Sequence, residues 1–361
     1  MALADLGWDD YFAGHFEQLK DGDLIPARVA EEHRNSYRVL TVNGLLSARV
    51  SGRFRHEACG YSEFPAVGDW VAIRLRPQEG KATIHHVLPR KGKFSRAAVL
   101  AGKTEEQVLA ANVDTAFLVS GLDHDFNLRR IERYVTIAWD SGAGPVVVLN
   151  KSDLCEDVDA IVEQVETTVL GVSVCAISAT ESEGIDRLTP FLTPGTTIAF
   201  LGSSGVGKST IINRLLGEER LKTSAVRQSD SKGVHTTTRR ELLPLPTGAI
   251  VIDTPGMREI QIWSEASGMD RSFGDIDALA LGCRFSDCSH LTEPGCAIQQ
   301  AIADGDLDAK RFQGYQKLQK ELHYLRIRQD QKAHRREVKE WHKKISRTLK
   351  EREKMRDKGV Y

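Results

Sequence analysis

Residues 202–209 read GSSGVGKS and fit the pattern G-x-x-x-x-G-K-[ST] in full. The apolar run TTIAFL precedes them and the segment STIINRLLG continues from their last residue, so the sequence predicts a buried strand, a glycine-rich loop and then a helix. Backbone N–H groups of such a loop turn inward around phosphates, and the helix N-terminus adds the positive end of its dipole. We therefore expect nucleotide phosphates to be bound by Gly202, Ser203, Ser204, Gly205, Val206, Gly207, Lys208, Ser209 and Thr210.

Two side chains of this loop and one later segment supply chemistry for phosphoryl transfer. Lys208 is expected to reach the β- and γ-phosphates, which makes it a catalytic candidate, and Ser209 is expected to ligate Mg²⁺. Downstream, VIDTPG (residues 251–256) begins as an apolar strand. It places Asp253 where a carboxylate can orient Mg²⁺, and Gly256 where a backbone amide can contact the γ-phosphate. A D-x-x-G that follows a phosphate loop is much more informative than an isolated one.

Between these two motifs lies the segment SKGVHTTTRR, residues 231–240. Its threonines are candidates for a switch residue that closes on Mg²⁺, namely Thr236, Thr237 and Thr238. Spacing does not decide which of the three closes on Mg²⁺. We take Thr237 as the candidate for both Mg²⁺ binding and catalysis.

The residue that orients the attacking water is not obvious from the motifs. Many nucleotide hydrolases of this type have Gln directly after the D-x-x-G glycine, but here that position is Met257, whose thioether is at best a weak acceptor. His235 is the nearest polar alternative in sequence, and its imidazole could hydrogen-bond the water. The competing interpretation is that His235 is a solvent-facing loop residue.

A base-recognition motif precedes the phosphate loop instead of following it. Residues 146–153 read VVVLNKSD, and the side chains of Asn150, Lys151 and Asp153 match what guanine requires, because a carboxylate accepts from both N1–H and the 2-amino group. Ser178 and Ala179 end the next apolar run in the same way, so the two segments supply the two loops that hold guanine. In an ordinary GTPase the phosphate loop comes first and these segments come last.

The pattern around these motifs alternates between strand and helix. Apolar strands are expected at 113–122, 145–150, 172–178, 196–202 and 249–256, with helices at 127–142, 156–171, 185–192 and after residue 208. Such alternation predicts an α/β domain with a mostly parallel sheet covered on both faces, which we place at residues 97–264. Residues 90–112, just before the first of these strands, are expected to form a loop.

The N-terminal part of the chain is expected to be all-β. Five short β-rich runs follow residue 25, and Asn43-Gly44 between the second and third is a strong hairpin signal. An OB-fold barrel over residues 25–96 is the best interpretation, and an SH3-like barrel also fits the pattern. Apolar residues at roughly helical spacing in residues 1–24 predict a short amphipathic arm.

A cysteine and histidine cluster follows the α/β segment. Residues 283–296 read CRFSDCSHLTEPGC, which is the spacing C-x₄-C-x-H-x₅-C. Three thiolates and one imidazole make a closed tetrahedral set of the structural zinc type, with Cys283, Cys288, His290 and Cys296 as ligands. The surrounding residues 265–361 are expected to be helical. The other three of the six cysteines, which are Cys59, Cys155 and Cys175, are scattered and are best explained as small core residues.

The order NKSD, SA, phosphate loop, threonine segment and DTPG resembles the RsgA/YjeQ family of ribosome small subunit-dependent, circularly permuted GTPases. The resemblance covers nearly the whole chain, because that family also carries an N-terminal OB-fold and a C-terminal zinc module with the same Cys, Cys, His, Cys order. It implies GTP and GDP as substrate and product, Mg²⁺, one structural Zn²⁺, and the small ribosomal subunit with its rRNA as partner. It further implies a role in late maturation or checking of that subunit, with hydrolysis triggering release.

The charge distribution is consistent with a polyanionic partner. Residues 310–358 carry 18 Lys and Arg against 7 Asp and Glu, and residues 25–96 carry 13 against 6, although the whole chain has a net charge of −1. Basic flanks favour nucleic acid because phosphate contacts supply most sequence-independent affinity, although a basic helix can also be a solvated face. Two other functions remain open: a nucleotide-gated RNA-binding protein in which hydrolysis is incidental, and an ATP-dependent RNA enzyme, which NKSD disfavours. No basic leader or long apolar run is present, so a monomeric cytoplasmic protein is expected.

Overall fold

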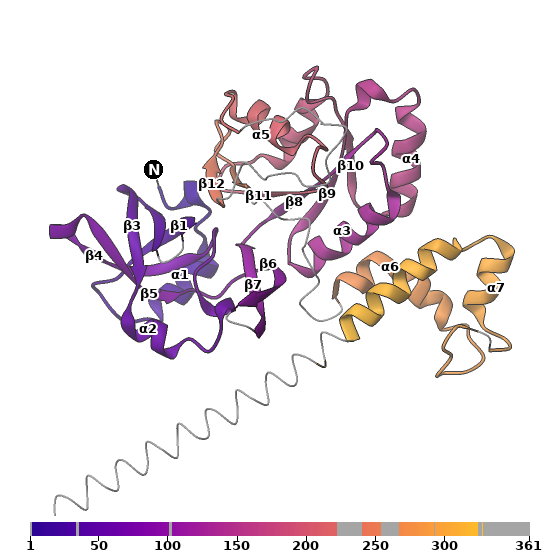
Figure 1. Ribbon diagram of the computed structural model, residues 1–361, viewed down its shortest axis with the longest axis horizontal. Helices are drawn as coiled ribbons and strands as arrows, with labels where there is room; N and C mark the ends of the chain where they lie inside the picture. Colours follow the sequence, from indigo (N-terminus) through magenta and orange to yellow (C-terminus); the bar gives the residue numbers. More distant parts are fainter. Residues whose placement is uncertain are drawn as a thin grey trace, which may run out of the picture. The chain divides into compact units, whose positions relative to one another are not determined.

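The computed structural model describes residues 2–33, 36–100, 103–221, 240–253, 267–291, 293–323 and 327. The chain divides into two compact units, Met1–Leu307 and Asp308–Tyr361 (Figure 1). The first unit contains every strand within the described ranges, together with the described residues of both predicted ligand sites. In the second unit, residues 309–323 form a helix in which the rings of Phe312 and Tyr315 stack.

Five N-terminal strands close into a barrel. They follow the order β1-β2-β3-β5-β4, and β4 pairs back onto β1. All pairings are antiparallel except that of β3 with β5, which is parallel. This closed five-stranded arrangement confirms the predicted OB-fold. The strands are β1 (Ile25–His33), β2 (Ser36–Thr41), β3 (Gly44–Val50), β4 (Trp70–Arg76) and β5 (Lys81–Val87).

The barrel interior is apolar. Burial alternates along β2 and β5, whereas residues 27–31 of β1 and 70–73 of β4 are buried without a break. Val29, Val39, Ile73 and Ile84 are completely buried in this core. Helix α2 (Gly52–Glu57) and the short 3₁₀ turns η2 (Tyr61–Glu63) and η3 (Pro77–Glu79) make the connections between strands β3, β4 and β5.

The N-terminal arm packs on the barrel. It consists of a 3₁₀ turn, η1 (Ala4–Leu6), and helix α1 (Asp10–Glu17), whose N-terminus is capped by the Asp9 carboxylate. Phe12 is 2% exposed and packs with Leu6, Trp70 and Leu88 in a separate apolar cluster. The amphipathic pattern of the arm therefore has a structural explanation, since its apolar face covers one side of the barrel.

The nucleotide-binding part is a six-stranded sheet in the order β10-β9-β8-β11-β13-β12. Every pairing within it is parallel except that of β12 with β13. Helices α3 and α5 lie on opposite sides of this sheet (Figure 1). The elements are β8 (Thr115–Gly121), α3 (Leu128–Asp140), β9 (Gly144–Asn150), η4 (Ser152–Leu154), α4 (Val158–Thr168), β10 (Ser173–Ala176), η5 (Ile185–Phe191), β11 (Thr197–Leu201), α5 (Lys208–Leu216), β12 (Glu241–Pro244) and β13 (Ile250–Asp253).

One expectation about this region was wrong. Residues 90–112 were expected to be a loop, but they form an antiparallel ribbon of β6 (Lys93–Leu100) and β7 (Lys103–Ala111). The run KTEEQVLAA is rich in residues with low strand propensity and lacks a clean polar–apolar alternation, so local sequence does not signal a strand. Cross-strand pairing supplies the stability instead, including an ion pair between Lys93 Nζ and Glu106 at 2.6 Å.

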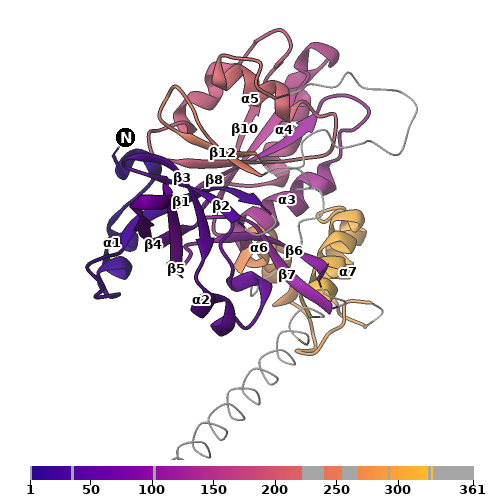
Figure 2. The same ribbon diagram turned by 60° about the vertical axis from the view of Figure 1, so that its left-hand side comes forward.

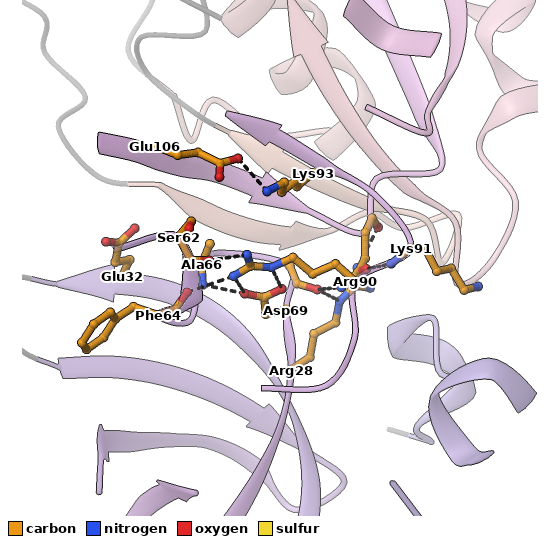
Figure 3. Close-up of polar contacts among 12 residues, drawn as sticks. Arg28, Glu32, Ser62, Phe64, Ala66, Asp69, Arg90, Lys91, Lys93 and Glu106 are labelled. Atoms are coloured by element: carbon orange, nitrogen blue, oxygen red, sulfur yellow. Dashed lines mark hydrogen bonds and ion pairs between the residues drawn. The ribbon is translucent and has the colours of Figure 1, made fainter. Parts of the chain in front are cut away.

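A polar network holds the barrel, the arm and the nucleotide-binding sheet together (Figure 3). The buried Arg28 guanidinium donates to Thr197 Oγ1 at 2.7 Å, to the Gly68 carbonyl at 3.2 Å and to the Leu6 carbonyl. Beside it, Arg90 forms a bidentate ion pair with the fully buried Asp69, at 2.8 and 2.6 Å. Buried charges are tolerated only when they are paired or hydrogen-bonded in this way.

Two further helices complete the first unit. They are α6 (Ser267–Ala280) and α7 (Ala297–Asp304), and α6 packs against α3. The guanidinium of Arg271 on α6 lies 4.9 Å from the ring centroid of Trp139 on α3, a cation–π contact. Across the residues that the structure describes, no helix combines the length and apolarity needed to span a bilayer.

Candidate functional site

Asn150 joins three motifs that lie far apart in the sequence. It is the last residue of β9 and is 3% exposed. Its Nδ2 donates to the Val206 carbonyl of the phosphate loop at 2.8 Å, and its Oδ1 accepts from the Ala179 amide at 3.0 Å. Parallel strands bring their carboxyl ends to one edge, where α/β proteins bind ligands. The structure thus brings the NKSD, SA and phosphate loops together at that edge.

The phosphate loop depends on close backbone approach. Gly202 and Gly207 have φ angles of 153° and 97°, which favour glycine. A Cβ on Gly207 would lie 2.2 Å from Asn150 Nδ2, so a larger residue would displace the base loop. Helix α5 begins at Lys208, directly after the loop. The Nζ of Lys208 donates to the Gly202 carbonyl at 2.8 Å. Ser209 therefore lies in the first turn of α5, which is the position expected of a Mg²⁺ ligand in such a loop.

The base loop is held by Asp123, a residue after β8 that the sequence analysis missed. Lys151 adopts a left-handed conformation, with φ 68°, and its Nζ pairs with Asp123 Oδ2 at 2.5 Å. Partial burial raises the pKa of Asp123, but the hydrogen bond and charge of Lys151 and two backbone hydrogen bonds together outweigh burial, so the pKa lies below its usual range. Ser178 Oγ donates to the Asp153 carboxylate, which links the two guanine loops. The one sequence signal for Asp123 is its position just after an apolar strand.

A second missed residue is Arg214, near the end of α5. Its Nε donates to the Ala179 carbonyl at 3.0 Å and its Nη2 donates to the Thr180 carbonyl at 3.0 Å. Arg214 therefore ties the SA loop to the helix that begins at the phosphate loop. No local pattern predicts this contact, since 35 residues separate the two partners.

Asp253 ends β13 at the same edge of the sheet. Burial raises its pKa to about 6, the charge of Lys208 opposes that shift, and the charge of Glu241 adds to it. A carboxylate in this environment suits a bound divalent cation, which favours the ionised form. Gly256, His235 and the three threonines at 236–238 lie outside the residues that the structure describes.

The cysteine and histidine cluster lies between α6 and α7. One ligand atom from each of Cys283, Cys288, His290 and Cys296 falls within 4.8 Å of all the others. Tetrahedral zinc with ordinary Zn–S and Zn–N bond lengths requires about 3.8 Å between sulfurs and about 3.5 Å from sulfur to nitrogen. Cys283 Sγ lies 4.0 Å from Cys296 Sγ, and each of these sulfurs lies 3.5 Å from His290 Nδ1. The geometry fits a closed zinc site.

Comparison with known proteins agrees with these geometries. A model of the RsgA GTPase family matches residues 87–263. A small ribosomal subunit biogenesis GTPase RsgA of Opitutus terrae is 50% identical over 98% of this chain and 99% of its own length. The chain belongs to the RsgA GTPase family. A second relative, RsgA 2 of Lactiplantibacillus plantarum, is 48% identical over 84% of this chain and 85% of its own.

Solved structures with the fold of the RsgA family are also similar. The crystal structure of YjeQ from Thermotoga maritima covers 83% of this chain, with 26% sequence identity and a TM-score of 0.60. YloQ, described as a circularly permuted GTPase, covers 84% of this chain at 22% identity and a TM-score of 0.58, a likeness of fold alone. The predicted permutation is therefore confirmed, and with it the assignment of this chain as a GTPase that handles GTP and GDP with Mg²⁺.

A second family model matches from the phosphate-loop strand onward. It is described as a 50S ribosome-binding GTPase and covers residues 197–347. Its match begins at the first residue of β11, so it excludes the NKSD and SA loops that come earlier in this chain. That break is what a permuted order of motifs produces.

Proposed function

We propose that this GTPase acts in biogenesis of the small ribosomal subunit. The proposed sequence of events is that it binds the subunit through rRNA contacts, that the subunit stimulates GTP hydrolysis during late maturation or checking, and that hydrolysis is coupled to release. Full-length relatives named for small subunit biogenesis support this function. The basic barrel and C-terminal region support an RNA partner, since counterion release favours binding to phosphates.

The observation that carries the proposal is the Asn150 contact with both Val206 and Ala179. It implies one continuous pocket in which guanine and phosphates are bound together. Within that pocket we assign Lys151 to the base plane, Asp153 to the N1–H and 2-amino groups, and the Ser178-Ala179 loop to the opposite edge of the base.

The phosphate end of the pocket has its own proposed set of residues. Backbone amides from Gly202 to Thr210 bind the phosphates, Lys208 stabilises the charge that develops on them, and Ser209 and Asp253 hold Mg²⁺. Gly256 contacts the γ-phosphate. Thr237 completes the Mg²⁺ shell, and His235 orients the attacking water.

A structural zinc ion is also part of the proposal. The four-residue cluster would bind one structural Zn²⁺, which supplies local folding free energy and takes no part in hydrolysis.

We further propose that the barrel occupies residues 25–96, the permuted GTPase domain residues 97–264 and the zinc-binding module residues 265–361. The proposed setting is the cytoplasm, where ribosomal subunits mature.

Multiple-turnover phosphate release tests the proposal. Full-length protein is assayed alone, with small ribosomal subunits and with large subunits. Small subunits are expected to stimulate phosphate release, and large subunits are not. His235→Ala should keep nucleotide and ribosome binding but lose roughly 10²-fold of the stimulated rate, the usual scale for a positioned acid–base group. Equal rates with and without small subunits would favour a nucleotide-gated RNA-binding protein in which hydrolysis is incidental.

A further inference from the structure

One strand pairing connects the barrel to the nucleotide-binding sheet. β1 pairs antiparallel with β12, where Glu31 lies opposite Glu241. β12 pairs in turn with β13, and in that ladder Glu241 lies opposite Asp253. In two views of the molecule, β12 lies between the barrel and the other strands of the sheet (Figures 1 and 2). Glu31, Glu241 and Asp253 therefore form a row across three strands, from the barrel to the proposed Mg²⁺ ligand.

This row places three carboxylates side by side. Directly opposed residues of an antiparallel pair project from the same face, and like charges in that position destabilise a sheet. Each of the three carboxylates faces a basic group from a different part of the chain. The cations are Arg38 for Glu31 at 2.9 Å, Arg220 for Glu241, and Lys208 for Asp253. Each of the like charges in the row therefore has a basic group that offsets it.

A second ion pair fixes the same junction from the other face. Glu32 directly follows Glu31 on β1, and Arg240 directly precedes Glu241 at the start of β12. Arg240 Nη1 lies 2.8 Å from Glu32 Oε2. The Arg240 side chain is only 14% exposed. Burial lowers the pKa of Arg240 and raises that of Glu32, and the mutual attraction of the two charges opposes both shifts. Removing one partner would leave the other charge poorly solvated.

We propose that Glu32 and Arg240 are positioning residues for GTP hydrolysis. Their ion pair holds β1 against β12 in the register that positions Asp253. Binding of a partner to the barrel would therefore change the geometry of the Mg²⁺ site through the row of Glu31, Glu241 and Asp253. Mg²⁺ requires near-ideal octahedral geometry at about 2.0–2.1 Å, so a small displacement of one ligand is enough to weaken it. The inference rests on the proposed role of Asp253 as a Mg²⁺ ligand.

The test compares full-length Glu32→Gln with the unchanged protein in two Mg²⁺ titrations, one of GTP hydrolysis and one of GDP binding followed with a fluorescent GDP analogue, and the midpoints of both should shift together. The Mg²⁺ concentration at half-maximal rate should rise by about three- to tenfold, the scale of mutational effects on coupled sites, while the rate at saturating Mg²⁺ stays within about twofold. Arg240→Lys keeps the charge and should give a smaller shift. Glu57→Gln is the matched control, because it breaks the Arg53–Glu57 pair of 2.9 Å on α2 of the same barrel and should shift nothing.

One further variant distinguishes a wrong Mg²⁺ assignment for Asp253 from a wrong role for the Glu32–Arg240 pair. Asp253→Asn should raise the Mg²⁺ requirement more than any other change, and if it does not, the assignment of Asp253 fails together with the inference. A shift in Asp253→Asn with none in Glu32→Gln would overturn the inference alone. Thermal unfolding by circular dichroism establishes that each variant is folded. If Glu32→Gln does not fold, the Mg²⁺ titration of Arg240→Gln decides, because this change removes the charge from the other side of the pair, and an unchanged Mg²⁺ requirement there rejects the coupling.

Discussion

Individual residues of the nucleotide site act mainly by bringing loops together. Asn150 is buried and uses both ends of its amide, one toward the phosphate loop and one toward the SA loop. Lys151 and Asp153 extend from the same loop and are each held by a partner, Asp123 and Ser178. The proposed base-binding and phosphate-binding loops are therefore joined directly by side-chain hydrogen bonds.

Base selectivity is predicted to depend on the Asp153 carboxylate. Asp153→Asn should weaken GTP binding by about 10- to 100-fold, because its amide would oppose the 2-amino donor of guanine and leave it unpaired. The same amide can donate to the 2-carbonyl of xanthine, so xanthosine triphosphate should bind more tightly than GTP. Competition binding with both nucleotides measures the change, and an unaltered GTP affinity would contradict the assignment.

Two glycines flank α5 and make a matched pair of variants. Gly207→Ala places a Cβ 2.2 Å from Asn150 Nδ2, so GTP binding should fall by at least about 10²-fold through displacement of both loops. Gly217 also has positive φ, at 71°, but a Cβ there meets nothing within 4 Å. Gly217→Ala should therefore cost about 1 kcal/mol of stability and leave GTP affinity nearly unchanged. Equal affinity losses in both variants would mean that backbone strain, not the contact with Asn150, is responsible.

Among the elements, the arm depends on packing against the barrel, and the cysteine–histidine segment is proposed to depend on a bound metal. The arm has two short elements, too short to be stable alone, and its apolar residues are buried on the barrel. The segment between α6 and α7 has little regular structure, and its four ligand atoms converge instead. Each feature leads to a separate prediction.

The arm is predicted to stabilise the barrel through Phe12. Phe12→Ala should lower the free energy of unfolding by about 3 kcal/mol, because it leaves a cavity against Trp70. Tyr11→Ala is the control, since the neighbouring Tyr11 side chain is 39% exposed and should cost far less. Urea denaturation followed by tryptophan fluorescence compares them, and similar midpoints for the two variants would show that the arm contributes little.

Metal removal is predicted to loosen the α6–α7 region while the sheet stays folded. A chelator, or Cys288→Ser, removes the folding free energy that structural zinc supplies locally. Hydrogen exchange should then increase in residues 281–304 and remain slow in β8, β9 and β11. Cys59→Ser should change neither, because Cys59 lies outside the cluster. Cys59 is exposed, so the expectation that it is a core residue was wrong, whereas Cys175 is buried as expected. Purified protein without zinc by elemental analysis would contradict the metal assignment.

The elements that sequence could predict are those with strong local patterns. The phosphate loop, the strand before NKSD and the Asn43-Gly44 hairpin each carry their signal within a few residues. The β6–β7 ribbon, Asp123 and Arg214 depend on partners brought together by the fold, and Lys151 and Asp123 are 28 residues apart. Single-sequence patterns do not encode such contacts. The roles of His235 and Thr237 stay predictions.

At the scale of the whole molecule, charge is predicted to dominate binding to the ribosome. The barrel and C-terminal regions are basic, although the chain is close to neutral. Affinity for small subunits should therefore fall by at least about tenfold between 50 and 200 mM salt, as counterion release requires. Reversing basic charges beyond Lys310 should flatten this slope. Equilibrium binding at several salt concentrations measures it, and a flat response would indicate apolar docking.

The buried Arg28 has a practical consequence for dissecting the protein into fragments. Its hydrogen-bond acceptors are spread over residues from Leu6 to Thr197, so a recombinant barrel without the later sequence would keep the Leu6 and Gly68 carbonyls but expose the end of the guanidinium that donates to Thr197 and Asn112. A cut between residues 96 and 97 would also sever β6. Fragments should therefore aggregate or unfold where the intact chain does not, and experiments on the barrel's RNA contacts are best done by substitution within the full-length chain.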